Sequence, residues 1–386
     1  PALICNKCGE EFLSHKVIDK CIQFVAKEGS DSWFNRDIKE FLQPDILCPY
    51  CKADSFSKGK DILDVWFDSG VSHQAVLKKR KELEFPCALY LEGSDQHRGW
   101  FQSSLIPSIC IDGIPPFKSV LTHGFVVDGL GRKMSKSLGN VISPQDTIKD
   151  YGADILRLWV ASCDYNEDIR ISREILSRLA EAYRKIRNTA RFILSNLFDF
   201  NPDKDKTSYN DLRKIDKWIL WRLEWLLDFV DNAYKNFEFY KAYKEIYDFC
   251  NEELSMYYLD MIKGRLYTYA ANSSERRQAQ TTIFEILNYL VRIIAPLLVF
   301  TSEEIWQNMP REKKDSSVPS VHLLDWPKRN PTFGQDNTPI EKNIDSQLST
   351  IIELISDVAW ALEEKRSQGI IGSSFEAQII LLTNSE

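Results

Sequence analysis

The feature that most constrains the fold is a series of amphipathic segments between Ile171 and Trp306. In the first segment, apolar residues recur three or four positions apart, which aligns them along one face of an α-helix. These apolar positions are Ile175, Leu179, Ala182, Ile186, Ala190, Ile193, Leu194 and Leu197. Similar segments follow at 212–234, 240–265 and 276–299. Because each apolar face must pack against another, the pattern predicts a helical bundle.

A different pattern precedes the bundle. Residues 87–91 form a short apolar run that ends at Glu92-Gly93, residues 95–109 have helical character, and residues 120–128 form a second apolar run. The order strand, turn, helix, strand predicts a parallel α/β unit. Ligands bind at the carboxyl ends of strands in such sheets, so we expect a site there. The expected fold class is α/β followed by all-α.

These patterns divide the chain into four predicted segments. The segments are 1–60, 61–170, 171–335 and 336–386. Residues 310–340, which are rich in Pro, Asn and charge, are predicted to be a linker. A further helix is predicted for 340–368, where it stops before Gly369, and a strand for 376–382.

Three local predictions concern helix ends and packing. Ser143-Pro144 is typical of a helix start, with serine as N-cap and proline in the first turn. Thr301–Glu304 has the pattern of a capping box that opens another helix. Trp66 and Phe67 are interpreted as core residues, with no chemistry assigned to them.

Composition restricts the class of protein. The 386 residues are 44% hydrophobic and 27% charged, which is typical of a globular protein. No apolar run approaches the roughly 20 residues of a membrane helix, and no export signal opens the chain, so we expect a cytoplasmic protein without membrane association. The net charge of −7 argues against a general basic surface but allows a local one. Since Pro1 is not an initiator methionine, the chain is expected to be a fragment or a processed or split product.

The strongest chemical signal is the string Lys133-Met134-Ser135-Lys136-Ser137. It lies in a glycine-bearing stretch, residues 129–140, that we call the lysine loop. Cations on a closing loop can neutralise the charge of a departing pyrophosphate, and serine can bond phosphate oxygens. The alternative is an ordinary basic surface loop. We predict that Lys133 and Lys136 are catalytic and that Ser135 and Lys136 contact ATP.

A second polar cluster follows the first predicted strand. It consists of Glu92, Gly93, Asp95, Gln96 and Trp100. This combination suits an amino acid joined to a nucleotide. It offers an anion for an ammonium group, a glycine that permits close approach, polar groups for a ribose and an apolar wall. The alternative is a helix start rich in capping residues. We predict that these five residues bind the ligand.

His123 ends the second apolar run, directly before Gly124 and shortly before the lysine loop. A single histidine is more often structural than functional. Its position at a strand end favours contact with ATP or an adenylate.

Two cysteine pairs bracket the first segment. They are Cys5-x-x-Cys8 and Cys48-x-x-Cys51. Four thiolates make a closed tetrahedral site, so we predict a structural Zn²⁺. The alternative is two unrelated pairs of reduced thiols.

Basic side chains gather after the lysine loop. They are Arg173, Arg178, Arg184, Lys185, Arg187 and Arg191. A solvated helix face explains any one of them, whereas the group can follow the phosphates of a nucleic acid.

These motifs resemble class I aminoacyl-tRNA synthetases. Residues 133–137 match the KMSKS signature of that class in all five positions. Residues 90–101 resemble the corresponding segment of isoleucyl-tRNA synthetases, whereas valyl and leucyl enzymes differ after the glycine. Residues 61–70, 265–268 and 301–306 also resemble the isoleucyl family.

The resemblance implies the second half of a Rossmann-like catalytic fold with a zinc-knuckle insertion, followed by a helical-bundle anticodon-binding domain. It implies ATP with Mg²⁺ and isoleucine as substrates, isoleucine tRNA as partner, and a monomer. The family's second signature, His-x-Gly-His, is missing from this sequence, so the first half of the nucleotide fold is expected upstream. Two alternatives are another class I synthetase, such as a valyl enzyme, and a non-catalytic tRNA-binding fragment.

Overall fold

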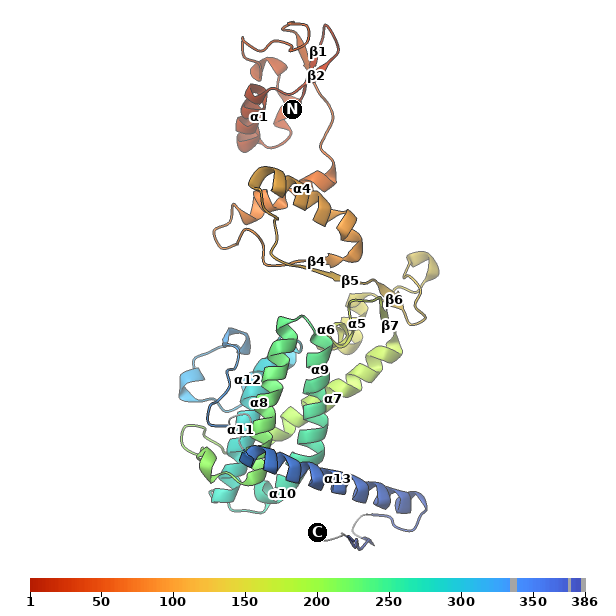
Figure 1. The fold of residues 1–386 in the computed structure, drawn as a ribbon, viewed down its shortest axis with the longest axis vertical. Helices are drawn as coiled ribbons and strands as arrows, with labels where there is room; N and C mark the ends of the chain where they lie inside the picture. The colour runs from red at the N-terminus through yellow and green to blue at the C-terminus, as the bar shows by residue number, and fades with distance from the viewer. Residues whose placement is uncertain (334–338, 374–375, 383–386) are drawn as a thin grey trace. The chain divides into compact units, whose positions relative to one another are not determined.

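The computed structural model describes residues 1–333, 339–373 and 376–382 (Figure 1). Its internal contacts define two compact units, Pro1–Thr122 and His123–Glu386, which we call the first and second units and describe separately. In the described part of the chain, no helix is long and apolar enough to cross a membrane.

The first unit opens with a small antiparallel sheet of strand order β2-β1-β3. Its strands are β1 (Leu3–Cys5), β2 (Glu11–Phe12) and β3 (Phe56–Lys58). Two helices and a 3₁₀ turn complete this part: α1 (His15–Glu28), α2 (Ser32–Asn35) and Ile38–Glu40. Leu3, Val17 and Phe41 are fully buried between these elements. This small core fixes both cysteine pairs, because Cys5 and Cys48 belong to it.

The rest of the first unit contains the predicted strand, turn and helix. Its elements are α3 (Val65–Gly70), a π-helical turn (His73–Leu77), β4 (Tyr90–Gly93), a 3₁₀ turn (Ser94–Arg98), α4 (Trp100–Asp112) and β5 (Val120–His123). β4 pairs with β5, and an isolated parallel bridge joins Cys87 to Phe117. At Gly70 an added Cβ would lie 2.2 Å from the Ser103 carbonyl oxygen, so α3 packs against α4 only because this residue has no side chain.

The second unit begins with a parallel strand pair, β6 (Val126–Asp128) and β7 (Ile169–Ile171). Between these strands lie a 3₁₀ turn (Lys136–Leu138), α5 (Pro144–Tyr151) and α6 (Ala153–Ser162). Ser143 caps α5 by accepting the Asp146 backbone N–H, which confirms the predicted helix start.

The single strand predicted for residues 120–128 is wrong, because the chain forms β5 and β6 there in two different sheets. Gly124 interrupts the run. Its N–H donates to the Tyr165 carbonyl at 2.9 Å, and an added Cβ would lie 2.3 Å from the Glu167 carbonyl oxygen. The close approach of another backbone segment therefore ends the first strand at His123.

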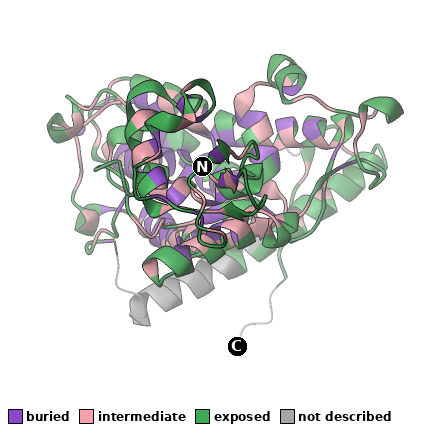
Figure 2. Cartoon of the chain, turned by 90° about the horizontal axis from the view of Figure 1, so that it is seen from above, coloured by how far each residue is buried: buried purple, intermediate pink, exposed green. Residues whose placement is uncertain are grey.

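The predicted helical bundle is confirmed. Its helices are α7 (Arg173–Ser195), α8 (Lys214–Lys235), α9 (Phe239–Asp248), a π-helical segment (Phe249–Tyr258), α10 (Leu259–Tyr267), α11 (Ser274–Ile294), α12 (Val299–Asn308) and α13 (Pro339–Ser367). Short 3₁₀ turns occupy Tyr209–Asp211, Lys313–Asp315 and Val321–Leu323. α11 is buried along most of its length and belongs to the main hydrophobic core. Figure 2 shows the buried residues of the chain in purple.

The predicted capping box at Thr301–Glu304 is wrong, because α12 already begins at Val299 and Thr301 lies inside it. The cap comes from another helix. The Asp154 carboxylate of α6 accepts the backbone N–H groups of Phe300 and Thr301 at 3.2 and 2.8 Å, and the Thr301 hydroxyl at 2.6 Å. An ionised carboxylate at a helix N-terminus satisfies the free N–H groups and the helix dipole together.

Two further local predictions are wrong. Trp66 and Phe67 are 48% and 43% exposed, so they are not core residues of the first unit. An apolar side chain is buried only where other residues pack against it, so the apolar character of these two residues was not sufficient to predict burial. Residues 376–382 are not a strand in the structure. An extended apolar run becomes a strand only when a neighbouring strand pairs with it.

Candidate functional site

The polar cluster after the first strand lies at the carboxyl end of β4, as the α/β pattern predicts. Gly93 is buried, whereas the side chains of Glu92 and Asp95 are exposed. The Glu92 carboxylate makes no hydrogen bond or ion pair with any residue that the structure describes. Its charge is therefore open to a ligand.

Gln96 and Trp100 have local structural partners. The Gln96 side-chain oxygen accepts the Trp100 backbone N–H at 2.9 Å, at the start of α4. The Trp100 ring stacks on Tyr90 with centroids 4.1 Å apart, and its Nε1 donates to the Ser69 carbonyl at 3.0 Å. These contacts agree with the alternative of a capped helix start, and ligand contacts by Gln96 and Trp100 stay predictions.

His123 is half-buried at the end of β5. Its Nδ1 lies 2.8 Å from the Gly124 carbonyl oxygen. Because a carbonyl oxygen can only accept, Nδ1 carries the proton, which leaves Nε2 of a neutral ring as an acceptor.

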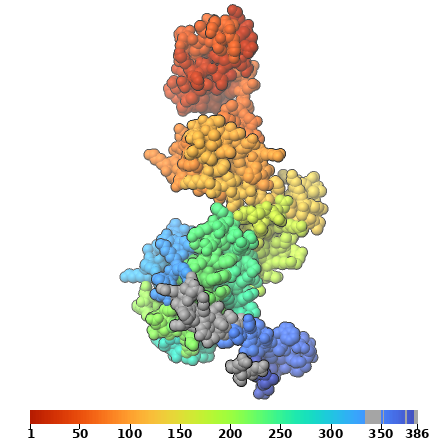
Figure 3. All heavy atoms as spheres, viewed as in Figure 1, coloured from red at the N-terminus to blue at the C-terminus, as the bar shows by residue number. Residues whose placement is uncertain are grey.

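The lysine loop projects from the surface of the second unit, as the yellow atoms in Figure 3 show. Lys133 and Lys136 are exposed and make no ion pair within the described ranges. Ser135 is partly buried, and its hydroxyl accepts the Leu138 N–H at 3.2 Å. Gly131 and Gly139 have φ values of 79° and 64°, so both turns of the loop use the left-handed conformation that glycine tolerates.

Asp128 and Asn140, to which the sequence motifs assigned no role, hold this loop. Asp128 ends β6, and its carboxylate accepts the Leu130 and Arg132 backbone N–H groups and the Asn140 amide. Asn140 follows the last glycine of the loop. A sequence signal existed, because Asp-Gly and Gly-Asn frame the loop, and such residues bond to nearby backbone.

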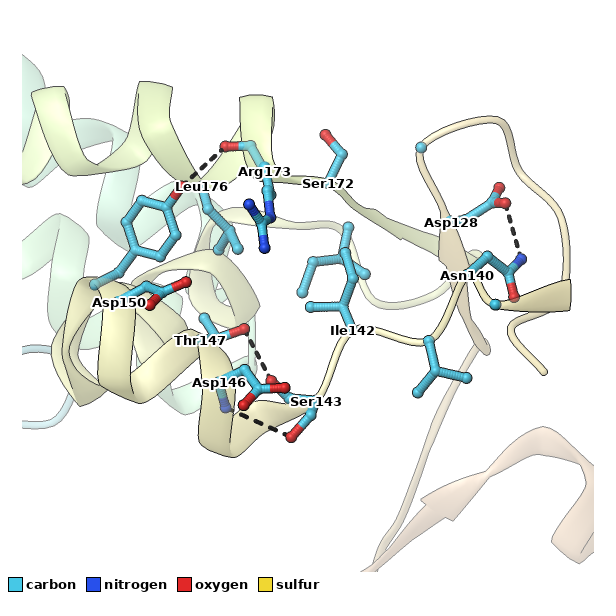
Figure 4. A pocket seen from close by; sticks show the side chains of 15 residues that line it. Asp128, Asn140, Ile142, Ser143, Asp146, Thr147, Asp150, Ser172, Arg173 and Leu176 are labelled. Carbon is cyan, nitrogen blue, oxygen red and sulfur yellow. Dashed lines mark hydrogen bonds between the residues drawn. The ribbon is translucent and has the colours of Figure 1, made fainter. Parts of the chain in front are cut away.

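A cavity of about 380 Å³ lies beside the base of the lysine loop (Figure 4). Asp128 at the end of β6 and the loop residues Gly139 and Asn140 form one wall. α5, the end of β7 and the start of α7 form the rest. This cavity does not follow from the sequence motifs, because its walls come from segments up to 48 positions apart, from Asp128 to Leu176.

The four predicted metal ligands come together. The Cys5 and Cys51 sulfurs lie 3.5 Å apart, those of Cys8 and Cys48 lie 3.6 Å apart, and all four fall within 4.8 Å of one another. Tetrahedral Zn–S bonds of about 2.3 Å place sulfurs about 3.8 Å apart, so the cluster can hold a metal ion of this kind.

Both cysteine pairs have the same backbone turn. The Gly9 N–H donates to the Cys5 carbonyl and the Lys52 N–H to the Cys48 carbonyl, each at 2.9 Å. Gly9 and Lys52 have φ values of 75° and 64°. The Cys8 backbone N–H lowers the pKa of the Cys5 thiol to about 6. At Cys8, the Glu10 backbone N–H is outweighed by desolvation and the neighbouring cysteine side chains, which raise the pKa of the thiol to about 12. Without a metal, backbone donors therefore favour the thiolate at Cys5 but not at Cys8.

The basic residues of α7 are exposed. Arg178 pairs with Glu174, and Arg187 pairs with Glu304 at 3.2 Å. Arg184 and Arg191 are seven positions apart and therefore lie on the same face of the helix. That this face binds phosphates remains a prediction.

The predicted ligand residues belong to two groups. Those from Glu92 to Trp100 lie in the first unit, whereas His123 and the lysine loop lie in the second. Their combination into one adenylate pocket remains a prediction.

The family comparisons agree with a parallel α/β pattern that carries a lysine loop and is followed by a helical bundle. Residues 1–172 match the family model for class I tRNA synthetases (I, L, M and V), and residues 216–381 match that for the anticodon-binding domain of tRNA ligases. The chain belongs to the class I tRNA synthetases.

Within that class, the similar curated proteins are isoleucine–tRNA ligases. The chain is 48% identical to that of Natranaerobius thermophilus over 386 residues, which is 100% of this chain and 40% of the relative. It is 50% identical to that of Syntrophotalea carbinolica over 377 residues, 98% of this chain and 40% of the relative. The chain thus spans about two fifths of the length of these relatives.

Solved structures support the fold. The ternary complex LeuRS-tRNA-LeuAMS of Agrobacterium radiobacter K84 aligns with a TM-score of 0.58 at 20% identity, covering 87% of this chain and 41% of that one. Mycobacterium tuberculosis methionyl-tRNA synthetase in complex with methionyl-adenylate aligns with a TM-score of 0.51 at 18% identity, covering 65% of this chain and 50% of that one.

Proposed function

We propose that this chain is part of an enzyme that activates isoleucine with ATP and attaches it to isoleucine tRNA. The observation that carries the proposal is 48% identity along the whole chain to a protein named isoleucine–tRNA ligase. The exposed, unpaired lysines of the loop supply the chemistry that such an activation needs.

In the proposed first step, an isoleucine carboxylate oxygen attacks the α-phosphorus of ATP bound with Mg²⁺. The bond from the α-phosphorus to the bridging oxygen breaks, and pyrophosphate leaves with the electron pair. Lys133 and Lys136 neutralise the charge that grows on this leaving group. Ser135 bonds a phosphate oxygen, and His123 contacts the adenylate.

Glu92 at the end of β4 pairs with the isoleucine ammonium group in this proposal. Gly93 lets the ligand approach the backbone, since no side chain stands there. Asp95 and Gln96 bond the ribose, and Trp100 contributes an apolar wall.

In the second step, the 2′-hydroxyl of the terminal adenosine of the tRNA attacks the isoleucyl carbonyl carbon, and AMP leaves. The exposed arginines of α7 bind tRNA phosphates, and the bundle from α8 to α12 binds the anticodon. The cytoplasmic location and the monomeric state also remain predictions.

For the metal site we propose Zn²⁺ bound by Cys5, Cys8, Cys48 and Cys51. Four thiolates close the coordination sphere, so the ion would stabilise the segment 1–60 and take no part in the reaction.

The test is pyrophosphate exchange by a full-length protein that contains this chain, measured with isoleucine, valine, leucine and methionine in turn. We expect exchange with isoleucine at the highest kcat/KM. Preference for valine would assign the chain to a valyl enzyme. No exchange with any amino acid, together with retained tRNA binding, would support the non-catalytic alternative.

A further inference from the structure

A hydrogen-bond network closes the base of the lysine loop. We propose that Asp128 and Asn140 are positioning residues that clasp the two ends of this loop and hold Lys133 and Lys136 in the arrangement that meets a triphosphate. This inference rests on the proposed function, because it assigns the loop its role in adenylate formation.

In this clasp, the Asp128 carboxylate is the acceptor at the start of the loop. Its Oδ1 accepts the Leu130 N–H at 3.0 Å and the Arg132 N–H at 2.9 Å. Its Oδ2 accepts Arg132 Nε and the Asn140 amide, each at 2.9 Å. The residue is only 7% exposed. The Asn140 amide, followed by the Arg132 backbone N–H, holds the pKa of this carboxyl well below its usual range, so it stays charged.

Asn140 forms the half that reaches across the loop. Its Nδ2, which donates to Asp128, also donates to the Lys133 carbonyl at 3.2 Å. Its Oδ1 accepts the Ser135 N–H at 2.9 Å. One amide therefore fixes the backbone on both sides of Met134, between the two lysines.

The position of the clasp gives it a role beyond closing a turn. Within the described residues, the side chains of Lys133 and Lys136 have no partner of their own, so the backbone decides where their charges lie. Stabilisation of a transition state requires charges that are already oriented, because reorientation during the reaction costs free energy. The clasp supplies that orientation before a ligand arrives.

The first test measures the clasp without activity, by amide hydrogen exchange on the 386-residue chain. With Asn140→Ala we expect the Ser135 amide to exchange about tenfold faster or more, since its acceptor is removed. With Asp128→Ala the Leu130 and Arg132 amides should respond likewise. Asp150→Asn is the matched control, because this exposed carboxyl lines the same cavity without a bond to the loop. Unchanged loop amides in both variants would overturn the clasp.

The second test is a double-mutant cycle in the full-length protein. Asn140→Ala should lower kcat for isoleucine-dependent exchange about tenfold or more, with the KM for isoleucine unchanged. In a protein that already carries Lys136→Ala, the further change Asn140→Ala should lower kcat by a much smaller factor than it does in the wild-type protein, because the clasp acts through the lysines. An equal loss in both backgrounds contradicts a positioning role.

The two proposals fail in different ways. If the clasp is wrong, the wild-type protein exchanges with isoleucine and Asn140→Ala leaves that rate unchanged. If the proposed function is wrong, the wild-type protein itself shows no isoleucine-dependent exchange, while the amide measurements still report on the clasp.

Discussion

At the scale of single residues, Lys133 and Lys136 of the lysine loop carry charges that no other side chain in the described structure neutralises. We expect such charges to act when a phosphate binds, because an interaction made only with the reacting ligand can accelerate the reaction. We predict that Lys136→Ala in the full-length protein slows adenylate formation about a hundredfold or more while isoleucine binding changes little. Pyrophosphate exchange measures the rate, with Lys149→Ala as control for an exposed lysine on α5. An unchanged exchange rate would remove Lys136 from the mechanism.

Glu92 offers the opposite charge at the end of β4. Glu92→Gln preserves the shape but removes the negative charge, so the proposed pairing with an ammonium group should be lost. We expect affinity for the aminoacyl-adenylate to fall about ten- to a hundredfold, as for other charged hydrogen bonds. Titration with a non-hydrolysable adenylate analogue checks this, with the exposed Glu82→Gln as control. If the Glu92 variant bound isoleucine and ATP with wild-type constants, the proposed contact between Glu92 and the ligand would be refuted.

At the scale of elements, we expect a bound metal to couple the two cysteine turns. Metal analysis of chain purified without chelator should give about one zinc per chain, because four thiolates complete one site. Cys48→Ser should lose the zinc and loosen β1, β3 and α1, since structural zinc contributes folding free energy. Cys110→Ser, at an exposed cysteine outside the cluster, should retain it. Absence of zinc from the wild-type chain under reducing conditions contradicts the site.

A buried ion pair joins α8 to α10. Arg265 donates two hydrogen bonds to Asp216 at 2.9 and 2.8 Å, and the Tyr258 hydroxyl donates a third at 2.7 Å. We predict that Asp216→Ala lowers the free energy of unfolding of the bundle by about 3–5 kcal/mol, because it leaves a buried guanidinium unpaired. Urea denaturation followed by circular dichroism measures this.

The control is the exposed pair Lys263–Asp260 on α10, whose atoms lie 2.7 Å apart. Asp260→Ala should cost less than about 1 kcal/mol, because solvent screens an exposed pair. Equal effects of the two substitutions would show that burial does not decide the contribution here.

At the scale of the whole molecule, the chain covers 40% of a relative such as the Natranaerobius ligase. We predict that the 386-residue chain alone does not activate isoleucine at a meaningful rate, because charge stabilisation requires groups from both halves of the nucleotide fold. Isoleucine-dependent pyrophosphate exchange by the purified chain is the measurement. Robust exchange would show that the lysine loop and the Glu92 segment suffice.

The helical bundle has a core of its own and should still bind tRNA weakly. That binding should weaken as salt rises, since contacts between arginines and phosphates release counterions. Fluorescence anisotropy with isoleucine tRNA at several salt concentrations tests this. Absence of binding at low salt would count against the bundle acting alone.

The sequence by itself determined the elements whose signal is local. Helical periodicity predicted the bundle, because burial of a helix face follows directly from the spacing of apolar residues. The two cysteine pairs predicted a metal cluster, since a turn aims both thiols of each pair in one direction. The string at residues 133–137 indicated the class through its resemblance to the KMSKS signature, and the family model that matches residues 1–172 confirms that class.

Only the tertiary structure decided what depends on distant partners. Gly124 ends β5 because the backbone near Glu167 approaches it, and Asp154 caps α12 from 146 positions away. Asp128 and Asn140 lie 12 positions apart and meet only once the loop folds back between them. Each of these features requires two segments to come together. A periodic pattern reports whether a residue is buried, but not which group it meets, because hydrogen-bond geometry depends on atomic positions that only the folded chain fixes.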